Sequence, residues 1–385
     1  MTCNWTKCKI SSLGTVITGK TPPTSDADNY GGDILFLTPS DDMSLKRVYS
    51  TRRTLSLLGL SKVKNCLLPP KAVCISCIGS DLGKVVMTTC NTVTNQQINS
   101  IIVNKELFDP DFIFYSLKIL GKRLNYLSKT STAVPIINKA SFCNETILVP
   151  PLTTQKRIAQ ILSDLDTKIE NNNRINGCLE AQVKGYYNEL IVNRDYPEGS
   201  ISDIADITMG QSPKGKSMNE TKKGSVFFQG RGEFGSRFPT IRLYTTEPTR
   251  FAKAGDTLIS VRAPVGDLNI AHEDCCIGRG LASIHAKNGY RSFVYYTLTA
   301  AKEELNIFNG QGTVFGSINR DNLKNLKIKI PPSEVIKQFE SLVEPIDKQI
   351  LANEDEVRRL SAIRDALLPK LMSGEIDVDS IRLDQ

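Results

Sequence analysis

The feature that most constrains this chain is an internal duplication. When the sequence is shifted by 181 residues, residues 150–190 fall on residues 331–371 without a gap, and nine of the 41 positions are identical. The apolar positions of the two copies coincide as well, in alternating steps of four and three. This spacing places them on one narrow stripe of a helix. The sequence therefore predicts a long helix in each copy, within residues 151–195 and 332–385.

Each helix has to bury its stripe against something. A helix of about 35 residues is roughly 50 Å long, well beyond the usual helix of a compact domain. We predict that the two helices pair with each other as an antiparallel coiled coil, in which an asparagine at the same stripe position of each copy fixes the register. The alternative is that each helix packs on its own globular domain. The positions expected in the helix pair are Leu165, Ile169, Asn172, Leu179, Ile346, Ile350, Asn353 and Leu360.

One residue disturbs the second helix. Pro345 stands where the first copy has Asp164. A proline inside a helix removes a backbone hydrogen bond and clashes with the preceding turn, which costs about 3 kcal/mol or forces a kink. We therefore expect a bend at Pro345 and two helical pieces, roughly residues 334–344 and 346–368.

The segments before the helices, residues 1–150 and 196–331, are also copies of one unit. Short β-branched runs separated by Gly, Asn and Asp recur in both, and their offset falls from 191 near the start to 181 before the helices. Such runs predict mixed, strand-rich domains, with helices near residues 111–127 and 292–305. The expected fold class is α+β: two repeated mixed α/β domains separated by two long helices, related by an approximate twofold axis within the chain.

Positive charge is concentrated in the predicted domains. Residues 1–150 hold 17 Lys and Arg against 10 Asp and Glu, and residues 196–331 hold 18 against 13. The helix segments are neutral (residues 151–195) or acidic (residues 332–385, seven against 12). Basic domains point modestly to a polyanion, because phosphate contacts release counterions.

Two further features bear on location and metals. The sequence has no apolar run near 18 residues and no basic-then-apolar leader, so we expect a soluble cytoplasmic protein that does not enter a membrane. The ten cysteines are scattered, unlike a secreted disulfide framework. Cys74 and Cys77 have zinc-ligand spacing, but their repeat counterparts Leu258 and Val261 are apolar, which favours buried cysteines over a metal site.

We find no catalytic constellation in the sequence. Residues 230–235 spell GxGxxG without a helix-forming sequence after them, and residues 79–85 fall one residue short of a phosphate-binding loop. The stretch Asp166-Thr167-Lys168 matches part of a nuclease motif, but it lies on a predicted long helix, where such charges are ordinarily solvated. We therefore expect a protein that is not itself an enzyme.

Over nearly its whole length the chain resembles the specificity subunit of type I restriction-modification systems. No single motif is specific, and the order and duplication of several together carry the resemblance. These stretches are residues 13–22 and 204–213 at the domain starts, 148–152 and 328–332 at the domain exits, 155–158 at the helix start, and 187–190 and 367–374 at the helix ends.

The resemblance implies a division of labour among subunits. Each domain would read one half of a split, asymmetric sequence in double-stranded DNA, while the helices space the halves and dock methyltransferase subunits, expected to number two. Restriction and translocation subunits would join the full complex. S-adenosylmethionine, ATP and Mg²⁺ would belong to these partners, so no cofactor is expected in this chain.

Candidate DNA contacts are long or polar donors in Gly-rich or polar loops. Arg can fork onto guanine and Gln onto adenine in the major groove, although a phosphate contact is the commoner role for any one of them. Two other functions stay open: a specificity module from a split type II-like system, and a protein-binding assembly adaptor without DNA readout. The candidates are Lys20, Thr21, Arg52, Arg53, Gln96 and Gln97 in the first domain, and Lys214, Lys216, Arg231, Arg237, Arg262 and Arg279 in the second.

Overall fold

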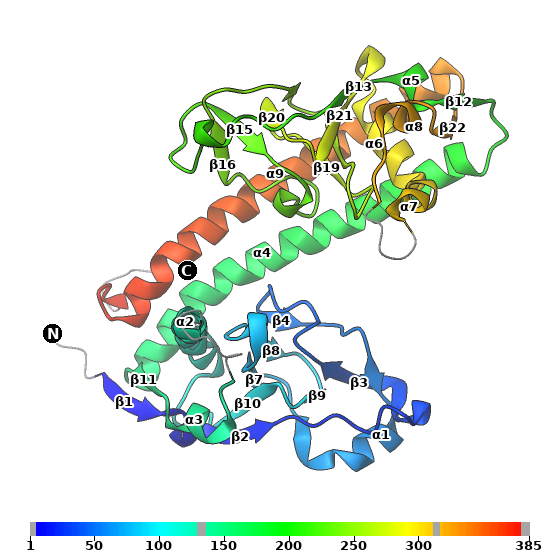
Figure 1. The fold of residues 1–385 in the computed structure, drawn as a ribbon. Helices are drawn as coiled ribbons and strands as arrows, with labels where there is room; N and C mark the ends of the chain where they lie inside the picture. Colours follow the sequence, from blue (N-terminus) through cyan, green and yellow to red (C-terminus); the bar gives the residue numbers. More distant parts are fainter. Residues whose placement is uncertain (1–4, 129–135, 311–315, 379–385) are drawn as a thin grey trace. The chain divides into compact units, whose positions relative to one another are not determined.

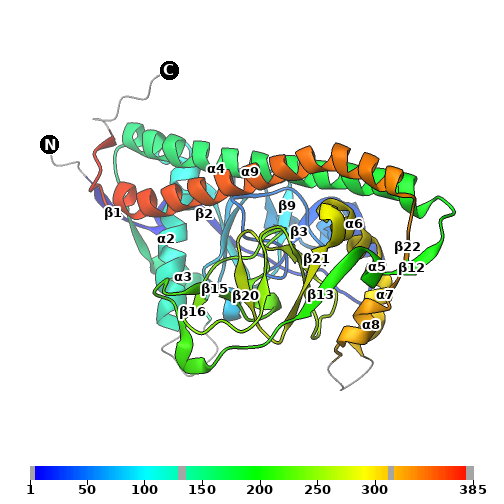
Figure 2. The same cartoon turned by 90° about the horizontal axis from the view of Figure 1, so that it is seen from above.

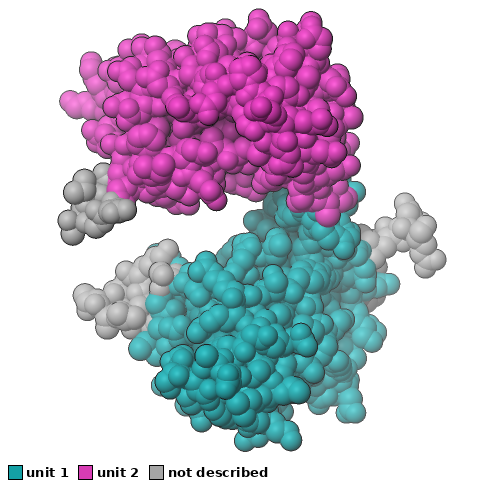
Figure 3. All heavy atoms as spheres, turned by 90° about the vertical axis from the view of Figure 1, so that its right-hand side faces the viewer, with its two compact units in different colours: residues 1–174, 354–385 teal, residues 175–353 magenta. Residues whose placement is uncertain are grey.

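The computed structural model describes residues 5–128, 136–310 and 316–378. The chain forms two compact units, coloured separately in Figure 3. The first unit comprises Met1–Arg174 and Glu354–Gln385, and the second comprises Ile175–Asn353. Each unit therefore combines one globular domain with a segment of each long helix.

The two predicted long helices are present. Helix α4 spans Leu152–Tyr187 and continues as a π-helical turn over Asn188–Val192, and helix α9 spans Ser333–Met372. The expectation that Pro345 divides the second helix is wrong, because α9 is continuous through it. Pro345 has no N–H to donate to the carbonyl of Ser341, four residues earlier in the helix. Both residues are exposed, so water can satisfy that carbonyl.

The first domain has three layers (Figure 1). Its central sheet has the strand order β2-β10-β7-β8-β4, and a second sheet has the order β5-β3-β9-β6. Helix α2 packs on β7 and β8, on the opposite face of the central sheet from the second sheet. Because both faces are covered, β7 is buried at every position. The elements are β1 (Thr6–Lys9), β2 (Gly14–Thr18), β3 (Tyr30–Leu37), β4 (Arg47–Val48), β5 (Thr54–Leu55), α1 (Leu57–Lys62), β6 (Leu67–Leu68), β7 (Val73–Ser76), β8 (Val85–Thr88), β9 (Thr92–Thr94), β10 (Ile98–Val103), α2 (Pro110–Ser128), α3 (Lys139–Asn144) and β11 (Thr146–Val149).

The second domain repeats this topology. Its central sheet, β13-β21-β18-β19, corresponds to β2-β10-β7-β8, and its second sheet, β14-β16-β15-β20-β17, contains a parallel pair, β15 and β20, as the first contains β3 and β9. The pair β12–β22 corresponds to β1–β11. The predicted duplication is thus confirmed for these strands, whereas β4 of the first domain and β14 of the second are additional edge strands. The elements are β12 (Glu198–Ser200), α5 (Ile201–Ile204), β13 (Ala205–Met209), β14 (Met218–Asn219), β15 (Ser225–Phe228), β16 (Leu243–Thr245), β17 (Phe251–Ala252), β18 (Thr257–Ser260), β19 (Leu268–Ile270), β20 (Cys275–Ile277), β21 (Leu281–Ala286), α6 (Arg291–Ala300), α7 (Lys302–Asn306), α8 (Arg320–Lys324) and β22 (Lys327–Lys329).

Within each unit the helix stripes contact both the other helix and the domain. In the first unit Leu162 of α4, Leu368 of α9 and Phe112 of α2 share one buried core. In the second unit Val183 of α4 and Phe339 of α9 do so with residues of α6. In both Figure 1 and Figure 2 the segments of α4 and α9 that belong to one unit lie side by side. Within each unit, each helix therefore buries its apolar stripe both against the other helix and against the globular domain.

Polar groups in the helix contacts show the relative direction of the two helices in the first unit and join them by a buried amide pair in the second. In the first unit Asn172 donates to Glu356 at 2.7 Å, and Arg364 donates to Asp166 at 2.7 Å. From the first contact to the second, the residue number rises along α9 and falls along α4, so the two segments run antiparallel. In the second unit the side chain of Asn353 donates to that of Asn176 at 2.7 Å. Of the eight predicted positions, Ile169, Asn172, Ile350 and Asn353 are buried, whereas Leu165, Leu179, Ile346 and Leu360 are half-buried.

Candidate nucleic-acid interface

In the first domain, the turn after β2 meets the loop between β9 and β10. The backbone N–H of Lys20 donates to the carbonyl of Thr94 at 2.9 Å, and the Thr21 hydroxyl donates to Oε1 of Gln96 at 2.7 Å. A Cβ on Gly19 would lie 2.1 Å from the Thr94 carbonyl oxygen, so this approach requires glycine. We call residues 19–21 and 94–97 the loop edge of the first domain.

Of the other candidates of this domain, Gln97 belongs to the loop edge and Arg53 lies beside it. Oε1 of Gln97 accepts from the Asn95 side chain at 3.0 Å. The guanidinium of Arg53 stacks on the ring of Tyr30 at 5.3 Å, and the Tyr30 hydroxyl donates to the carbonyl of Pro22, the residue after Thr21. Arg53 is thereby held close to the loop edge. Arg52 is exposed, and its backbone N–H donates to Asp41 at 2.7 Å.

The second domain builds the same meeting of loops with different side chains. The N–H of Gly210 donates to the carbonyl of Leu281 at 2.9 Å, and the N–H of Arg279 donates to Oγ of Ser212 at 3.3 Å. A Cβ on Gly210 would lie 2.2 Å from the carbonyl oxygen of Gly278. In the repeat, Ser212 corresponds to Thr21 and Arg279 to Gln96. The scaffold is conserved between the two domains while the exposed side chain changes.

Loops that carry three arginines are joined by backbone hydrogen bonds at this edge of the second domain. The N–H of Gly278 donates to the carbonyl of Phe228 at 2.8 Å, and the N–H of Val261 donates to the carbonyl of Gly280 at 3.0 Å. These bonds join the loops that carry Arg231, Arg262 and Arg279, all of them exposed. We call residues 210–212, 228–231, 261–262 and 278–280 the loop edge of the second domain.

The remaining cations of the second domain differ in how they are held. Arg231 forms an ion pair with Asp267, a carboxylate that Lys302 also approaches, at 3.5 Å. Lys214 is 86% exposed and lies 3.8 Å from Glu247. Lys216 is exposed in the turn after the loop edge. Exposed ion pairs of this kind contribute little to stability, so these side chains are free to exchange partners.

Arg237 does not fit the prediction of an exposed DNA contact, because its side chain is only 1% exposed. It donates to Asp347 of α9 at 2.5 Å and to the Tyr296 hydroxyl at 2.9 Å. Burial alone would lower the pKa of its guanidinium, but the Asp347 carboxylate and the neighbouring tyrosines, Tyr295 and Tyr296, keep that pKa above its usual value. Arg237 is thus a charged, fully enclosed contact between the second domain and a long helix.

Lys84 is an exposed cation outside the loop edge of the first domain that the sequence interpretation missed, and it forms an ion pair with Asp81 at 2.6 Å. It is exposed, and its carbonyl accepts from the N–H of Ser76 at 2.9 Å, just as the carbonyl of Asp267 accepts from Ser260. The signal was present in the repeat, because a glycine with positive φ precedes both residues: Gly83 at 88° and Gly266 at 89°.

The buried cysteines lie on two sides of one sheet. Cys74 belongs to the core between the two sheets of the first domain, and Cys77 to the core under α2. Burial raises the pKa of Cys74 to about 12, and burial also raises the pKa of Cys77. Two thiols that point into different cores cannot share one tetrahedral ion, so their spacing does not make a metal site. This agrees with the preference for buried cysteines.

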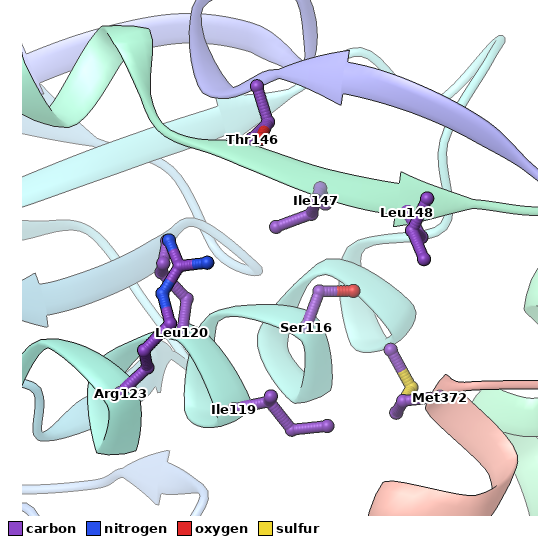
Figure 4. A pocket seen from close by; sticks show the side chains of 8 residues that line it. All are labelled: Ser116, Ile119, Leu120, Arg123, Thr146, Ile147, Leu148 and Met372. Carbon is purple, nitrogen blue, oxygen red and sulfur yellow. The ribbon is translucent and has the colours of Figure 1, made fainter.

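The first unit also contains an apolar pocket, shown in Figure 4. Its volume is about 220 Å³, and it contains none of the candidate DNA contacts. Helix α2, strand β11 and the end of α9 form it together, with Arg123 at its side held by an ion pair to Glu145. Its lining residues are Ser116, Ile119, Leu120, Arg123, Thr146, Ile147, Leu148 and Met372.

The arrangement of the loop edges suits the specific binding of a ligand better than catalysis. Hydrogen-bonding side chains project from loops that rigid sheets hold in place, a common basis of specific binding. None of the helices in the described parts of the chain combines the length and apolar character that crossing a bilayer requires.

Comparisons with known proteins agree on one family. Residues 3–181 and 193–359 match the sequence profile of the type I restriction modification DNA specificity domain. A protein of Methanocaldococcus jannaschii provisionally named as the specificity subunit of the type I restriction enzyme MjaX is 33% identical, covering 71% of this chain and 70% of that protein. The MjaIX specificity subunit of the same organism is 26% identical and covers 98% of this chain and 95% of its own length. The crystal structure of a type I restriction-modification S subunit from M. genitalium covers 96% of both chains with a TM-score of 0.61 at 17% identity, a likeness of fold.

Proposed function

Because the chain belongs to the specificity subunits of type I restriction-modification systems, we propose that each of its domains reads one half of a bipartite DNA sequence. The observation that carries this proposal is the duplicated loop edge. Equivalent loops present Thr21 and Gln96 in one domain, and Ser212 and Arg279 in the other. Readers with the same scaffold and different side chains would recognise two different half-sites, which together make an asymmetric target.

The proposed contacts follow from side-chain chemistry. The guanidinium of Arg279 suits the two acceptors of guanine, and the amide of Gln96 suits adenine. Lys20, Lys214 and Lys216 are exposed single cations, better matched to phosphates, which position a protein without reading sequence. Each base reader would therefore affect one position of one half-site, whereas each phosphate contact would affect all sequences alike.

We infer that α4 and α9 pair along their whole length as an antiparallel coiled coil and so set the distance between the half-sites. Two observations support this. The contacts Asn172 to Glu356 and Asn176 to Asn353 lie in different units, yet both follow nearly the same antiparallel register. The polar pairs also suit the known role of buried amides in fixing register.

The partners are proposed from the charge division and the family. The domains are basic, which favours DNA binding, and the helix segments are neutral or acidic, which favours contacts with proteins. We propose that two methyltransferase subunits dock on the helices, that restriction subunits join them, and that S-adenosylmethionine, ATP and Mg²⁺ bind those partners.

The test is to map methylated bases in a genome that expresses this chain with its methyltransferase partner. We expect one split motif with a fixed number of unread base pairs between its halves. Arg279→Ala should relax one position in one half and leave the other half unchanged. Lys327→Ala is the matched control, because Lys327 is 81% exposed and lies on β22, outside the loop edge.

The alternatives predict other results. An assembly adaptor would give no motif and almost no salt dependence of duplex binding by the complex. A split type II-like module would act with a single fused nuclease and methyltransferase, which a pull-down would identify. Uniform loss of methylation at all sites in Arg279→Ala would reassign that residue to the phosphates.

A further inference from the structure

Two buried cations occupy equivalent places in the two domains, and neither belongs to a loop edge. Lys46 and Arg237 are related by the offset of 191 that also relates the domain starts. Their backbones agree as well: the carbonyl of Lys46 accepts from Met87 of β8, and that of Arg237 accepts from Ile270 of β19, both at 2.8 Å. Their side chains are 0% and 1% exposed, respectively. The duplication has therefore kept a buried positive charge at this place.

In the first unit the cation joins the domain to a long helix. Nζ of Lys46 lies 2.6 Å from Oγ of Ser163 on α4 and 2.6 Å from Asp111 at the start of α2. It also lies 4.7 Å from the ring centre of Tyr115. The Tyr115 hydroxyl in turn donates to Asp166 of α4 at 2.5 Å. A loop, the domain helix and the long helix thus meet at one set of polar atoms.

In the second unit the same parts meet with a different cation. The guanidinium of Arg237 contacts Asp347 of α9, the Tyr296 hydroxyl of α6 and, at 3.5 Å, Glu180 of α4. It stacks over the ring of Tyr295 at 4.4 Å. Tyr115 and Tyr296 are 181 residues apart, and so are Asp166 and Asp347. We call the two groups the cation clusters: Lys46, Tyr115, Ser163 and Asp166 with Asp111, and Arg237, Tyr296, Asp347 and Glu180.

Stability alone is a weak reason for such clusters. The apolar cores already attach each domain to its helix segments. A buried ion pair has to overcome a large desolvation cost, and well-packed apolar residues often replace one without loss of stability. Apolar contacts are non-directional, whereas a hydrogen-bonded cation has a required geometry, most of all a planar guanidinium. The apolar cores attach each domain to its helix segments, and the clusters restrict the orientation in which it is attached.

We propose that the two cation clusters are positioning sites that fix the angle of each recognition domain on its own helix segments and thereby enforce a single spacing between the DNA half-sites. This rests on the proposed function. One base pair adds roughly 3.4 Å along the DNA axis and turns the helix by about 35°. A domain held at one angle on its helix segments can reach its half-site at only one number of intervening base pairs. A domain held by apolar contacts alone would rock on its helix and accept neighbouring spacings.

The experiment compares methylation of duplexes that carry both half-sites at the native spacing or one base pair longer or shorter. The holo-complex with the methyltransferase subunit is used, and the sites come from the genome map. The main variant is Arg237→Met with Tyr296→Phe and Asp347→Leu, which removes the buried Arg237–Asp347 pair and the hydroxyl at similar volume and leaves Glu180, whose side chain is 26% exposed. The matched control is Lys327→Met with Glu198→Leu, which removes an exposed ion pair of the same domain, with side chains 81% and 70% exposed.

We expect the control to keep the wild-type preference for the native spacing. The triple variant should lose at least tenfold of that preference while keeping the half-site bases. Arg237→Lys keeps the charge and the fold but not the planar fork, and it should lose part of the preference, even if the triple variant fails to fold.

Unchanged spacing preference in the folded triple variant and in Arg237→Lys would overturn the proposal. So would a change in the half-site bases, which would place the cluster in base recognition. The function proposed above fails separately, because it fails when the wild-type complex methylates no bipartite site at all.

Discussion

The stability of the second unit depends on whether both charges of its buried ion pair are kept or both removed. Arg237→Met alone leaves Asp347, 18% exposed, without its cation. Breaking a buried pair from one side costs about 3–5 kcal/mol, because the remaining charge stays desolvated. For a body of this size each kcal/mol lowers the melting temperature by about 2–4 °C, so we expect a drop of roughly 6–20 °C. Adding Asp347→Leu and Tyr296→Phe to Arg237→Met should recover most of the lost stability.

Thermal unfolding followed by calorimetry and circular dichroism would measure these differences. The exposed pair Lys327 and Glu198 provides the comparison, since removing Lys327 should change stability by less than about 0.5 kcal/mol. If Arg237→Met costs no more than this control, Asp347 must find another partner or take up a proton at little cost. The argument from an enclosed charge would then be refuted.

Three further outcomes are expected. Asn353→Leu should destabilise the chain by about 1–3 kcal/mol, because it leaves the buried side-chain oxygen of Asn176 without its donor. Adding Asn176→Leu should restore most of this loss in a denaturant titration. Asp111→Asn should cost about 3 kcal/mol near pH 7. Burial alone would raise the pKa of Asp111, but the Lys46 ammonium holds that pKa below its usual value. The stability advantage of the wild type is therefore fully present above about pH 4 and is lost as the pH falls through the lowered pKa, so an advantage that does not shrink on acidification below about pH 4 would contradict this assignment. Alkylation monitored by mass spectrometry should label exposed Cys90 and spare Cys74 in the folded chain, and fast labelling of Cys74 would show that its core opens.

The repeat also shows how far sequence reasoning can reach into the candidate site. The loop edges were found because Gly19 and Gly210 end strands in turns, a local property that glycine and proline report directly. Arg237 was misplaced because an arginine in a polar, Gly-rich stretch looks the same whether it faces solvent or a tyrosine and two acids from distant helices. Lys84 was missed because the glycine shared by the two copies, Gly83 and Gly266, indicates only a turn, whereas strand pairing across the sheet decides where the next residue lies.

Pro345 shows the same limit in the fold. The residue type reports the lost hydrogen bond, but its cost depends on which side of the helix faces water. That side is set by the apolar stripe of α9 and by what covers it in the second unit, including Phe339 and Val343. With Pro345 on the exposed side, the helix continues.

The sequence by itself determined the duplication, the two long helices and the strand-rich character of the domains, because periodicity and turn chemistry act over a few neighbouring residues. Only the tertiary structure decided which polar side chains are enclosed and which are offered to solvent. It gathered Lys46 with Asp166, and Arg237 with Asp347, from segments more than 100 residues apart. Burial is a property of the assembled layers, and it alone separates a cation that can meet DNA from one that holds a domain to its helix.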